Sequence, residues 1–447
     1  MVRLPRNPLR RHRSDTSDAI EATTPRPGEP RNHRLIAFQY RNYRLYFSGQ
    51  LVSVIGTWMQ TTSEAWLVVD LLHASAIQLA FVPVCQFGPV LCLGIPCGIL
   101  SDRFPKRRIL MTTQTVFGLL AFAMMLLIAS GLVQLWHVYA IAFIYGVNMA
   151  IDQPARQAFV SEMVGKEAVM NAVSLNSAVF NSGRVVGPAV AGALLAIFGP
   201  AVCFGINAAS YVAVLIGLAL MRVTPHVKRV TGSAIAGMKE GLAYVRATPD
   251  IMRTVVLIGF IGTFAVNYNV WVPLLAQKNF LAGAGTYGLL MASMGVGSLC
   301  GALSLAIFGG RKPSRKRMFL AAMGLGLAEI ALGYVSAVPL SVYFGMATLA
   351  MIGFFSSSAM ATANTIVQTT ASDQYRGRVM AVYMTVFSGT TPLGSLAAGA
   401  VAETLGAPAS VAAGGAIALA AAIAIAWLQR NRMETARARK ITGQAAD

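Results

Sequence analysis

Long apolar runs dominate the chain from residue 45 onward, each of about 20 or more residues and separated by short polar breaks. A helix of that length crosses the hydrocarbon core of a bilayer, which is roughly 30 Å thick. Helices satisfy their own backbone hydrogen bonds, as an apolar surrounding requires. The runs therefore predict an all-α membrane protein. Its twelve expected spans cover residues 45–69, 78–101, 109–130, 135–157, 171–198, 202–222, 253–276, 285–309, 317–336, 339–364, 379–402 and 408–429.

The composition excludes an ordinary soluble protein. Of the 447 residues, 12% are charged and 55% hydrophobic, whereas a soluble domain carries about 25% charged residues. The loops between the expected spans are too short for an extramembrane domain. The cysteines lie within apolar runs, without the paired spacing of a metal site or a disulfide framework. We expect neither a metal nor a cofactor. The cysteines are Cys85, Cys92, Cys97, Cys203 and Cys300.

The basic residues predict the orientation, because Lys and Arg are retained on the cytoplasmic side of membrane proteins. With the N-terminus inside, 34 of the 36 Lys and Arg residues fall on that side; Arg184 and Lys278 are the exceptions. Both termini are therefore expected to be cytoplasmic, in a bacterial inner membrane. The same distribution accounts for the pI of about 10.2 better than nucleic-acid binding does, since no folded soluble segment remains to bind a duplex.

The spans divide into two sets of six. Residues 1–44 form a basic, disordered cytoplasmic tail in this prediction, and residues 430–447 form a second tail. Residues 45–222 and 253–429 form two pseudo-symmetric six-helix bundles, and the linker at 223–252 contains an amphipathic helix. Two short matches between the bundles support an internal repeat, because 106–108 and 315–317 are both basic and Ala-Val recurs at 172–173 and 381–382. Parallel six-span repeats are typical of many secondary transporters.

The break after the second span carries the stretch Gly98-Ile-Leu-Ser-Asp102-Arg103-Phe-Pro-Lys106-Arg-Arg-Ile-Leu. It resembles the motif that the major facilitator superfamily carries between its second and third spans, with Pro105 in place of the usual glycine. The resemblance implies a tight helix contact at Gly98. It also implies a cytoplasmic clasp in which Asp102 and Lys106 meet Asp152 of the fourth span, holding one conformation and breaking in the other.

The fifth span carries a second motif, Gly183-Arg184-Val-Val-Gly187-Pro188-Ala-Val-Ala-Gly192. It resembles a motif of superfamily antiporters that export their substrates. Glycines spaced by four let a neighbouring helix approach closely, and the proline removes a backbone hydrogen bond. The alternative interpretation is plain helix packing, which Arg184 makes less adequate.

The run Asp152-Gln-Pro-Ala-Arg-Gln-Ala158, followed by the fifth-span motif, is similar to the bacterial branch that contains the enterobactin exporter and other transmembrane secretion effectors. The resemblance extends over residues 40–425. It implies export of a small molecule, siderophore-like or drug-like, by alternating access and proton antiport. A lipid or lysolipid flippase and an uptake carrier of the same fold remain the alternatives.

A few ionisable groups fall inside the expected spans, where an unpaired charge costs about 2.5–3.5 kcal/mol and normally faces a cavity or a partner. Glu64, Arg184 and Glu329 are the candidates for proton coupling. In the functional interpretation, Glu64 is a protonatable carboxylate whose charge is coupled to substrate release, while Arg184 holds a nearby anion or stabilises the charged form of Glu64. In the structural interpretation, Glu64 and Arg184 form a pair or each reach water separately.

Polar and aromatic residues on the first, fourth, seventh and tenth spans are candidates for a substrate cavity, because these spans line the centre in the superfamily. They are Trp58, Gln60, Tyr145, Asn148, Asn267, Tyr268, Asn269, Phe354, Phe355 and Asn364. We expect a small-molecule substrate, protons and membrane lipids as partners, and a monomer. A membrane enzyme is disfavoured because four of the five histidines lie outside the spans, His137 lies at the start of the fourth, and no metal-ligand spacing occurs.

Overall fold

A computed structural model describes residues 35–222, 234–308, 314–337 and 342–444, and within these ranges all regular structure is helical. The predicted N-terminal tail lies almost wholly outside the described residues, as does the first part of the predicted linker. The helices before the linker are α2 (Arg41–Trp66), α3 (Ala76–Arg103), α4 (Lys106–Ala129), α5 (Leu135–Met163), α6 (Val169–Phe198) and α7 (Pro200–Leu220). Those after it are α8 (Ala234–Ala247), α9 (Pro249–Phe260), α10 (Tyr268–Leu274), α11 (Ala284–Phe308), α12 (Arg315–Ala337), α13 (Val342–Thr370), α14 (Arg376–Gly389), α15 (Thr391–Leu405) and α16 (Ala407–Gln444).

Five short helical segments complete the part of the chain that the structure describes. Two are 3-10 helices, η2 (Ile36–Gln39) and η4 (Lys166–Ala168). Three are π-helical turns, η3 (Leu67–Leu71), η5 (Ile261–Ala265) and η6 (Leu275–Asn279), and two of these interrupt the predicted seventh span. A π-turn inserts a residue into a helix and occurs often at functional sites.

Ten helices in the described ranges are long and apolar enough to cross a membrane. They match ten of the predicted spans. The first predicted span is helix α2, which is long enough but carries Arg41, Arg44, Gln50, Gln60 and Glu64. The eleventh is divided into the short helices α14 and α15, because the helix breaks at Thr390, just before Pro392. A proline near a helix start is tolerated, but it cannot continue the preceding hydrogen-bond ladder.

Local sequence explains several of the helix ends. Ser75 accepts a bond from the amide of Gln78, and the Gln78 side chain accepts one from the Ser75 amide, so α3 begins with a capping box. Gly199 and Gly406 end α6 and α15 with positive φ angles of 75° and 89°, conformations that suit glycine. The same tight reversal therefore occurs before the last helix of each half of the chain.

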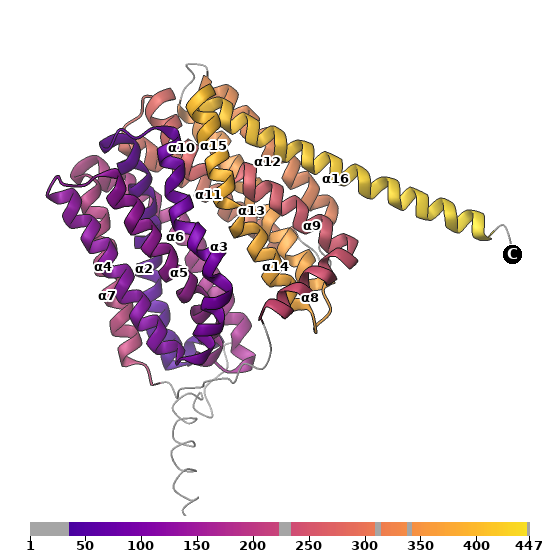
Figure 1. Ribbon diagram of the computed structural model, residues 1–447, viewed down its shortest axis with the longest axis horizontal. Coiled ribbons are helices and arrows are strands. Elements are labelled where there is room, and N and C mark those ends of the chain that lie inside the picture. Colours follow the sequence, from indigo (N-terminus) through magenta and orange to yellow (C-terminus); the bar gives the residue numbers. More distant parts are fainter. Residues whose placement is uncertain (1–34, 223–233, 309–313, 338–341, 445–447) are drawn as a thin grey trace, which may run out of the picture.

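The helices before and after the linker gather on opposite sides of the molecule (Figure 1). The most extensive contacts between them pair α3 with α15 and α6 with α11. Helix α8 lies in the described part of the segment predicted as a linker and packs against α14, with Val245 fully buried. Helix α16 does not end near residue 429 as expected but continues to Gln444, so that its last turns project from the body (Figure 1).

Basic side chains mark one end of the helical body, which we call the basic end. Arg107 donates to the carbonyls of Leu218 and Ala219 at the end of α7. Arg315 pairs with Asp250, and Arg378 pairs with Glu240 of α8. Helix α8 lies at this end of the molecule (Figure 1).

The two sets of helices meet most closely at the opposite end. Glu403 of α15 accepts bonds from the amides of Ala76 and Ile77, at 2.7 and 3.4 Å, and so caps the first turn of α3. Trp66 stacks on Tyr287 with ring centroids 5.0 Å apart. At the basic end of α3, in contrast, a Cβ atom added to Gly98 would meet nothing within 4 Å. The expected tight contact at Gly98 is therefore wrong for this conformation, because no neighbouring helix of the described chain lies in contact with α3 there.

Candidate functional site

Arg184 lies at the middle of α6, between an aromatic ring from each set of helices. Its guanidinium carbon is 5.8 Å from the ring centroid of Trp58 in α2 and 5.6 Å from that of Tyr268 in α10. Such positions over ring faces stabilise a cation by about 0.5–2 kcal/mol. Its buried Nε atom has no hydrogen-bond partner in the described chain. The three residues, which we call the Arg184 site, leave a donor available to an anion.

The fifth-span glycines fix this position by close packing. A Cβ atom on Gly183 would lie 2.7 Å from a methyl group of Val54, and one on Gly187 would lie 2.5 Å from the Cβ of Trp58, so both glycines press α6 against α2. Gly192 faces the other way, where a Cβ atom would lie 2.7 Å from the Cα of Gly288 in α11. Helix α6 thus packs tightly against α2 of its own set and against α11 of the other set. Pro188 lies buried between these two contacts.

Tyr268 is placed by a break in the seventh predicted span. The π-turn η5 ends at Ala265, and Val266 and Asn267 leave the helical conformation, so that Tyr268 begins the separate helix α10. The Asn267 amide donates to the carbonyl of Thr263 at 2.7 Å, while its buried Oδ1 has no partner among described residues. Asn269 follows in the first turn of α10 and is half-buried. Broken helices of this kind form substrate and ion sites in many transporters.

The π-turn before the break is held by close backbone contacts. A Cβ atom on Gly394 of α15 or on Gly414 of α16 would collide with the carbonyls of Thr263 and Phe264, respectively. Glycine at both positions lets α15 and α16 lie directly against η5. The irregular backbone is therefore a packed feature of the fold.

Glu329 lies beside the same turn. The residue is 1% exposed in α12, and neither carboxylate oxygen has a hydrogen-bond partner in the described chain. A Cβ atom on Gly414 would lie 3.8 Å from its Oε2 atom, so Glu329 and the Phe264 carbonyl approach the same glycine. Burying an ionised carboxylate with no partner costs several kcal/mol, so the group needs a proton or a cation here.

Glu64 is half-buried near the end of α2, and no hydrogen bond or ion pair joins its side chain to another described residue. It lies near enough to Tyr145 of α5 for an electrostatic interaction between them. Arg184 makes no ion pair with it in the described structure. The interpretation of Glu64 and Arg184 as a structural pair is therefore wrong for this conformation.

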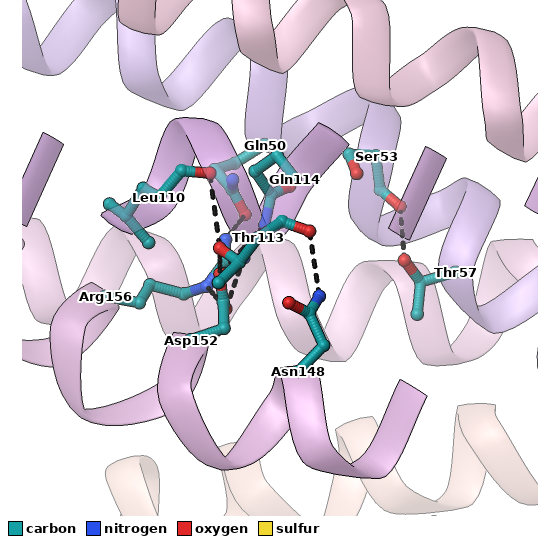
Figure 2. A network of polar contacts seen from close by, with 9 residues as sticks. All are labelled: Gln50, Ser53, Thr57, Leu110, Thr113, Gln114, Asn148, Asp152 and Arg156. Atoms are coloured by element: carbon teal, nitrogen blue, oxygen red, sulfur yellow. Dashed lines mark hydrogen bonds and ion pairs between the residues drawn. The ribbon is translucent and has the colours of Figure 1, made fainter. Parts of the chain in front are cut away.

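Asp152, in contrast to Glu64, is surrounded by hydrogen-bond partners, in a polar network between α2, α4 and α5 (Figure 2). Its Oδ1 atom accepts bonds from Thr113 at 2.6 Å and Gln114 at 3.0 Å. Its Oδ2 atom receives both Nε and Nη2 of Arg156, at 2.8 and 2.7 Å. Arg156 also donates to Gln50 at 2.7 Å, which ties α2 to the network. Every charge in this cluster is paired, as buried charges require.

This network corrects one part of the predicted clasp. Lys106 is buried and donates to the carbonyl of Ser101 at 2.6 Å, but it is not among the described partners of Asp152. Arg156 takes that place because it lies one helical turn further along α5, on the same face. The i, i+4 spacing of Asp152 and Arg156 was visible in the sequence and predicts the pair. The side chain of Asp102 lies outside the described residues, and Arg103 is exposed at the end of α3.

Several cavity candidates instead tie helices together. Gln60 accepts a bond from Asn207 of α7. Asn148 donates to the carbonyl of Thr113 at 2.8 Å and joins the network of Figure 2. Tyr145 packs on Phe117, with ring centroids 4.6 Å apart. Asparagine and glutamine side chains bond across helices in this way where water is scarce.

The candidates on α13 lie apart from the Arg184 site. Gly301 of α11 meets the backbone of Phe354, about two helical turns further along α11 than Gly295, whose neighbour is Arg184. Phe355 packs on Gly324 of α12, and Asn364 accepts a bond from Gln368 at 2.9 Å. Of the ten predicted cavity residues, the structure thus brings Trp58 and Tyr268 to Arg184, with Asn267 and Asn269 adjacent in the chain.

Sequence comparison decides the family. The transmembrane secretion effector family matches residues 34–443. The chain belongs to this family of major facilitator transporters. The staphyloferrin A transporter of Staphylococcus aureus is 25% identical over 365 residues, which are 81% of this chain and 90% of the relative. The multidrug efflux pump Tap of Mycolicibacterium fortuitum is 25% identical over 370 residues, covering 80% and 88%.

Solved structures agree on the fold. A D-xylose-proton symporter has a TM-score of 0.71 at 13% identity, covering 86% of this chain and 97% of its own. A bacterial homologue of the lysosomal transporter Spinster, in an inward-facing and occupied conformation, has a TM-score of 0.68 at 14% identity, covering 88% and 97%. The protein is therefore a multi-pass major facilitator transporter of small molecules.

Proposed function

We propose that this transporter exports a small anionic molecule, siderophore-like or drug-like, by proton antiport and alternating access. The observation that carries the proposal is the Arg184 site. A cation with an unused donor, between two aromatic faces at the junction of the two sets of helices, suits a cargo that combines an anionic group with rings. The siderophore and drug transporters among the relatives support export of such a cargo.

In this proposal the chain crosses the inner membrane twelve times, as two six-helix bundles, with α2 and the α14–α15 pair as the spans of lower hydropathy. The basic end faces the cytoplasm, as do both termini. The helices meet at the opposite end, whereas no described neighbour contacts α3 at Gly98, so the conformation described here is inward-facing. A monomer suffices, because both bundles lie in one chain.

Coupling is assigned to Glu64 and Glu329. Glu329 is buried with no described hydrogen-bond partner, so it exists at low cost only with a proton or a cation bound. Glu64 is half-buried in the helical body and likewise has no described hydrogen-bond partner. Glu329 lies against the π-turn that places Tyr268, so a change in its charge acts on one wall of the Arg184 site. Protonation and cargo binding would then favour different conformations of the broken helix.

Inverted membrane vesicles test the proposal. Two anionic probes, staphyloferrin A and novobiocin, and the cation ethidium as a control are added in turn to vesicles with a preformed acidic interior, and the proton gradient is followed with a pH-sensitive dye. At least one anionic probe should enter and dissipate the gradient, and ethidium should not. The Arg184→Gln and Glu64→Gln variants should lower this signal about tenfold or more, a change worth about 1.4 kcal/mol.

The matched control is Arg44→Gln, which removes an exposed arginine from the basic end of α2. It should transport at the native rate. Accumulation that persists without any gradient, or in Glu64→Gln, would refute the antiport mechanism. Movement of probe and protons in the same direction would show an uptake carrier, and exchange of labelled lipid alone would show a flippase.

A further inference from the structure

A cavity of about 440 Å³ lies toward the basic end of α11, α12 and α13, away from the Arg184 site. Lys316 and Arg317 form its charged side, and the hydroxyls of Ser304 and Ser358 lie beside them. Leu320 and Phe355 form an apolar wall. No acidic residue is among the described side chains that line it, so the cavity carries a net positive charge.

Arg317 extends across the cavity. Its Nη2 atom donates to the Ser304 hydroxyl at 2.7 Å, and that oxygen lies 3.5 Å from the hydroxyl oxygen of Ser358. A guanidinium has five N–H donors, and the structure describes one of them in use. The neighbouring Arg315 has a different role, because it pairs with Asp250 and does not line the cavity.

The helices that bear the cavity also expose apolar side chains. Leu320, which lines the cavity, is about half exposed, and Leu303 and Ile307 of α11, one and three residues from Ser304, are about half exposed or more. Leu327 and Tyr334 continue the exposed row along α12. In a chain of this family an outward apolar face is covered by lipid chains. The charged side therefore opens at one border of the bilayer, next to surfaces suited to acyl chains.

We propose that this cavity binds the phosphate headgroup of an anionic phospholipid, such as phosphatidylglycerol, from the leaflet at the basic end. Arg317 would form a bidentate contact with the phosphate, and Lys316 would add a point charge. The acyl chains would lie along Leu303 and Leu320. Basic pockets between membrane helices recognise lipid headgroups in this manner. The proposal is independent of cargo and coupling, since it concerns a site that neither uses.

Lipid binding by the purified, delipidated full-length protein tests the proposal. Native mass spectrometry in detergent measures the bound fraction during titration with dioleoyl phosphatidylglycerol or dioleoyl phosphatidylcholine. The native protein should retain one phosphatidylglycerol at least tenfold more tightly than phosphatidylcholine. Arg317→Gln should weaken that binding about tenfold and Lys316→Gln about fivefold, because each basic residue near a headgroup contributes about this much.

Arg315→Gln is the matched control, since it removes the same charge one or two residues away without touching the cavity. Its affinity for phosphatidylglycerol should stay within twofold of native. Leu320→Trp fills the mouth of the cavity without changing charge and should also weaken binding, which separates a pocket from general attraction. Because Leu320 is more than half exposed, the tryptophan should not disturb folding. An unchanged melting temperature of the variant verifies this.

Three outcomes would overturn the proposal. Equal affinities for the two lipids would show that charge is not recognised. Equal losses in Arg315→Gln and Arg317→Gln would show surface attraction only. Displacement of the lipid by inorganic phosphate at low millimolar concentration would show that the cavity binds a free anion instead.

Discussion

Asp152 and Arg184 are both charged groups inside the helical body, on the neighbouring helices α5 and α6, yet their surroundings differ completely. Both oxygens of Asp152 are bonded, to Arg156, Thr113 and Gln114. Arg184 has only ring faces beside it and a buried donor without a partner. The paired charges fasten three helices of one set, whereas the unpaired charge lies between the two sets. A fully bonded charge suits stability, and an incompletely bonded one suits a ligand that comes and goes.

The strongest test of this contrast is Asp152→Asn. The substitution leaves the Arg156 guanidinium partly buried without its counter-charge, which we expect to lower the free energy of unfolding by about 3 kcal/mol. Reversible denaturation in mixed detergent micelles measures the change. Asp373→Asn is the control, because Asp373 is paired with Arg376 but 90% exposed, and it should cost less than about 1 kcal/mol. An equal cost at both positions would contradict the structural role of the network.

Gly187→Ala tests how the Arg184 site is held. The added methyl group would lie 2.5 Å from the Cβ of Trp58, so α6 and α2 must separate, at a cost of about 1–3 kcal/mol. Gly94→Ala is the matched control, because a Cβ atom there meets nothing within 4 Å. It should leave the unfolding free energy unchanged or raise it by up to about 1 kcal/mol, since alanine favours a helix. Equal destabilisation by both changes would show that the motif glycine has no special packing role.

The sequence predicts these helices far better than it predicts the site. Hydropathy depends on short windows of sequence, so ten of the predicted spans coincide with helices long and apolar enough to cross a membrane. Trp58, Arg184 and Tyr268 lie far apart in the chain, and only the packing of α2, α6 and α10 brings them together. Trp58 lies beside Arg184, whereas Gln60, only two residues later in the same helix, bonds to Asn207. No local sequence pattern distinguishes these two positions.

The errors have similar causes. Phe354 and Phe355 lie on the tenth predicted span, but which face of that helix meets the centre depends on its rotation against α11 and α12. The lack of a tight contact at Gly98 follows from the conformation, which a sequence does not specify. The Arg156 pair, in contrast, follows from a spacing of four and required no tertiary information.

Arg184→Lys separates charge from shape within the unpaired site. Lysine keeps the positive charge but loses the planar group that lies over the rings of Trp58 and Tyr268, and with it the forked donor geometry. We expect transport of an active probe to fall about threefold to fivefold, less than in Arg184→Gln. Initial rates in inverted vesicles give the comparison. If lysine and glutamine reduce transport equally, the charge alone contributes nothing and the anion assignment is wrong.

The smallest expected effect concerns the end of the molecule opposite the basic end, where Glu403 caps α3. Glu403→Gln keeps the shape of the side chain but removes a negative charge from a helix N-terminus, a loss of about 0.3–1 kcal/mol. Because this contact joins α15 to α3, it is broken when the helices separate at that end, so the variant should favour the opposite conformation twofold to fivefold.

Distances between spin labels placed on the first turn of α3 and the last turn of α15 measure that shift. Thr404→Val, at an exposed neighbouring position, should leave the distance distribution unchanged. A Glu403→Gln distribution identical to the native one would show that the closed end is held by packing, through Gly399 and Gly192, and owes nothing to the cap.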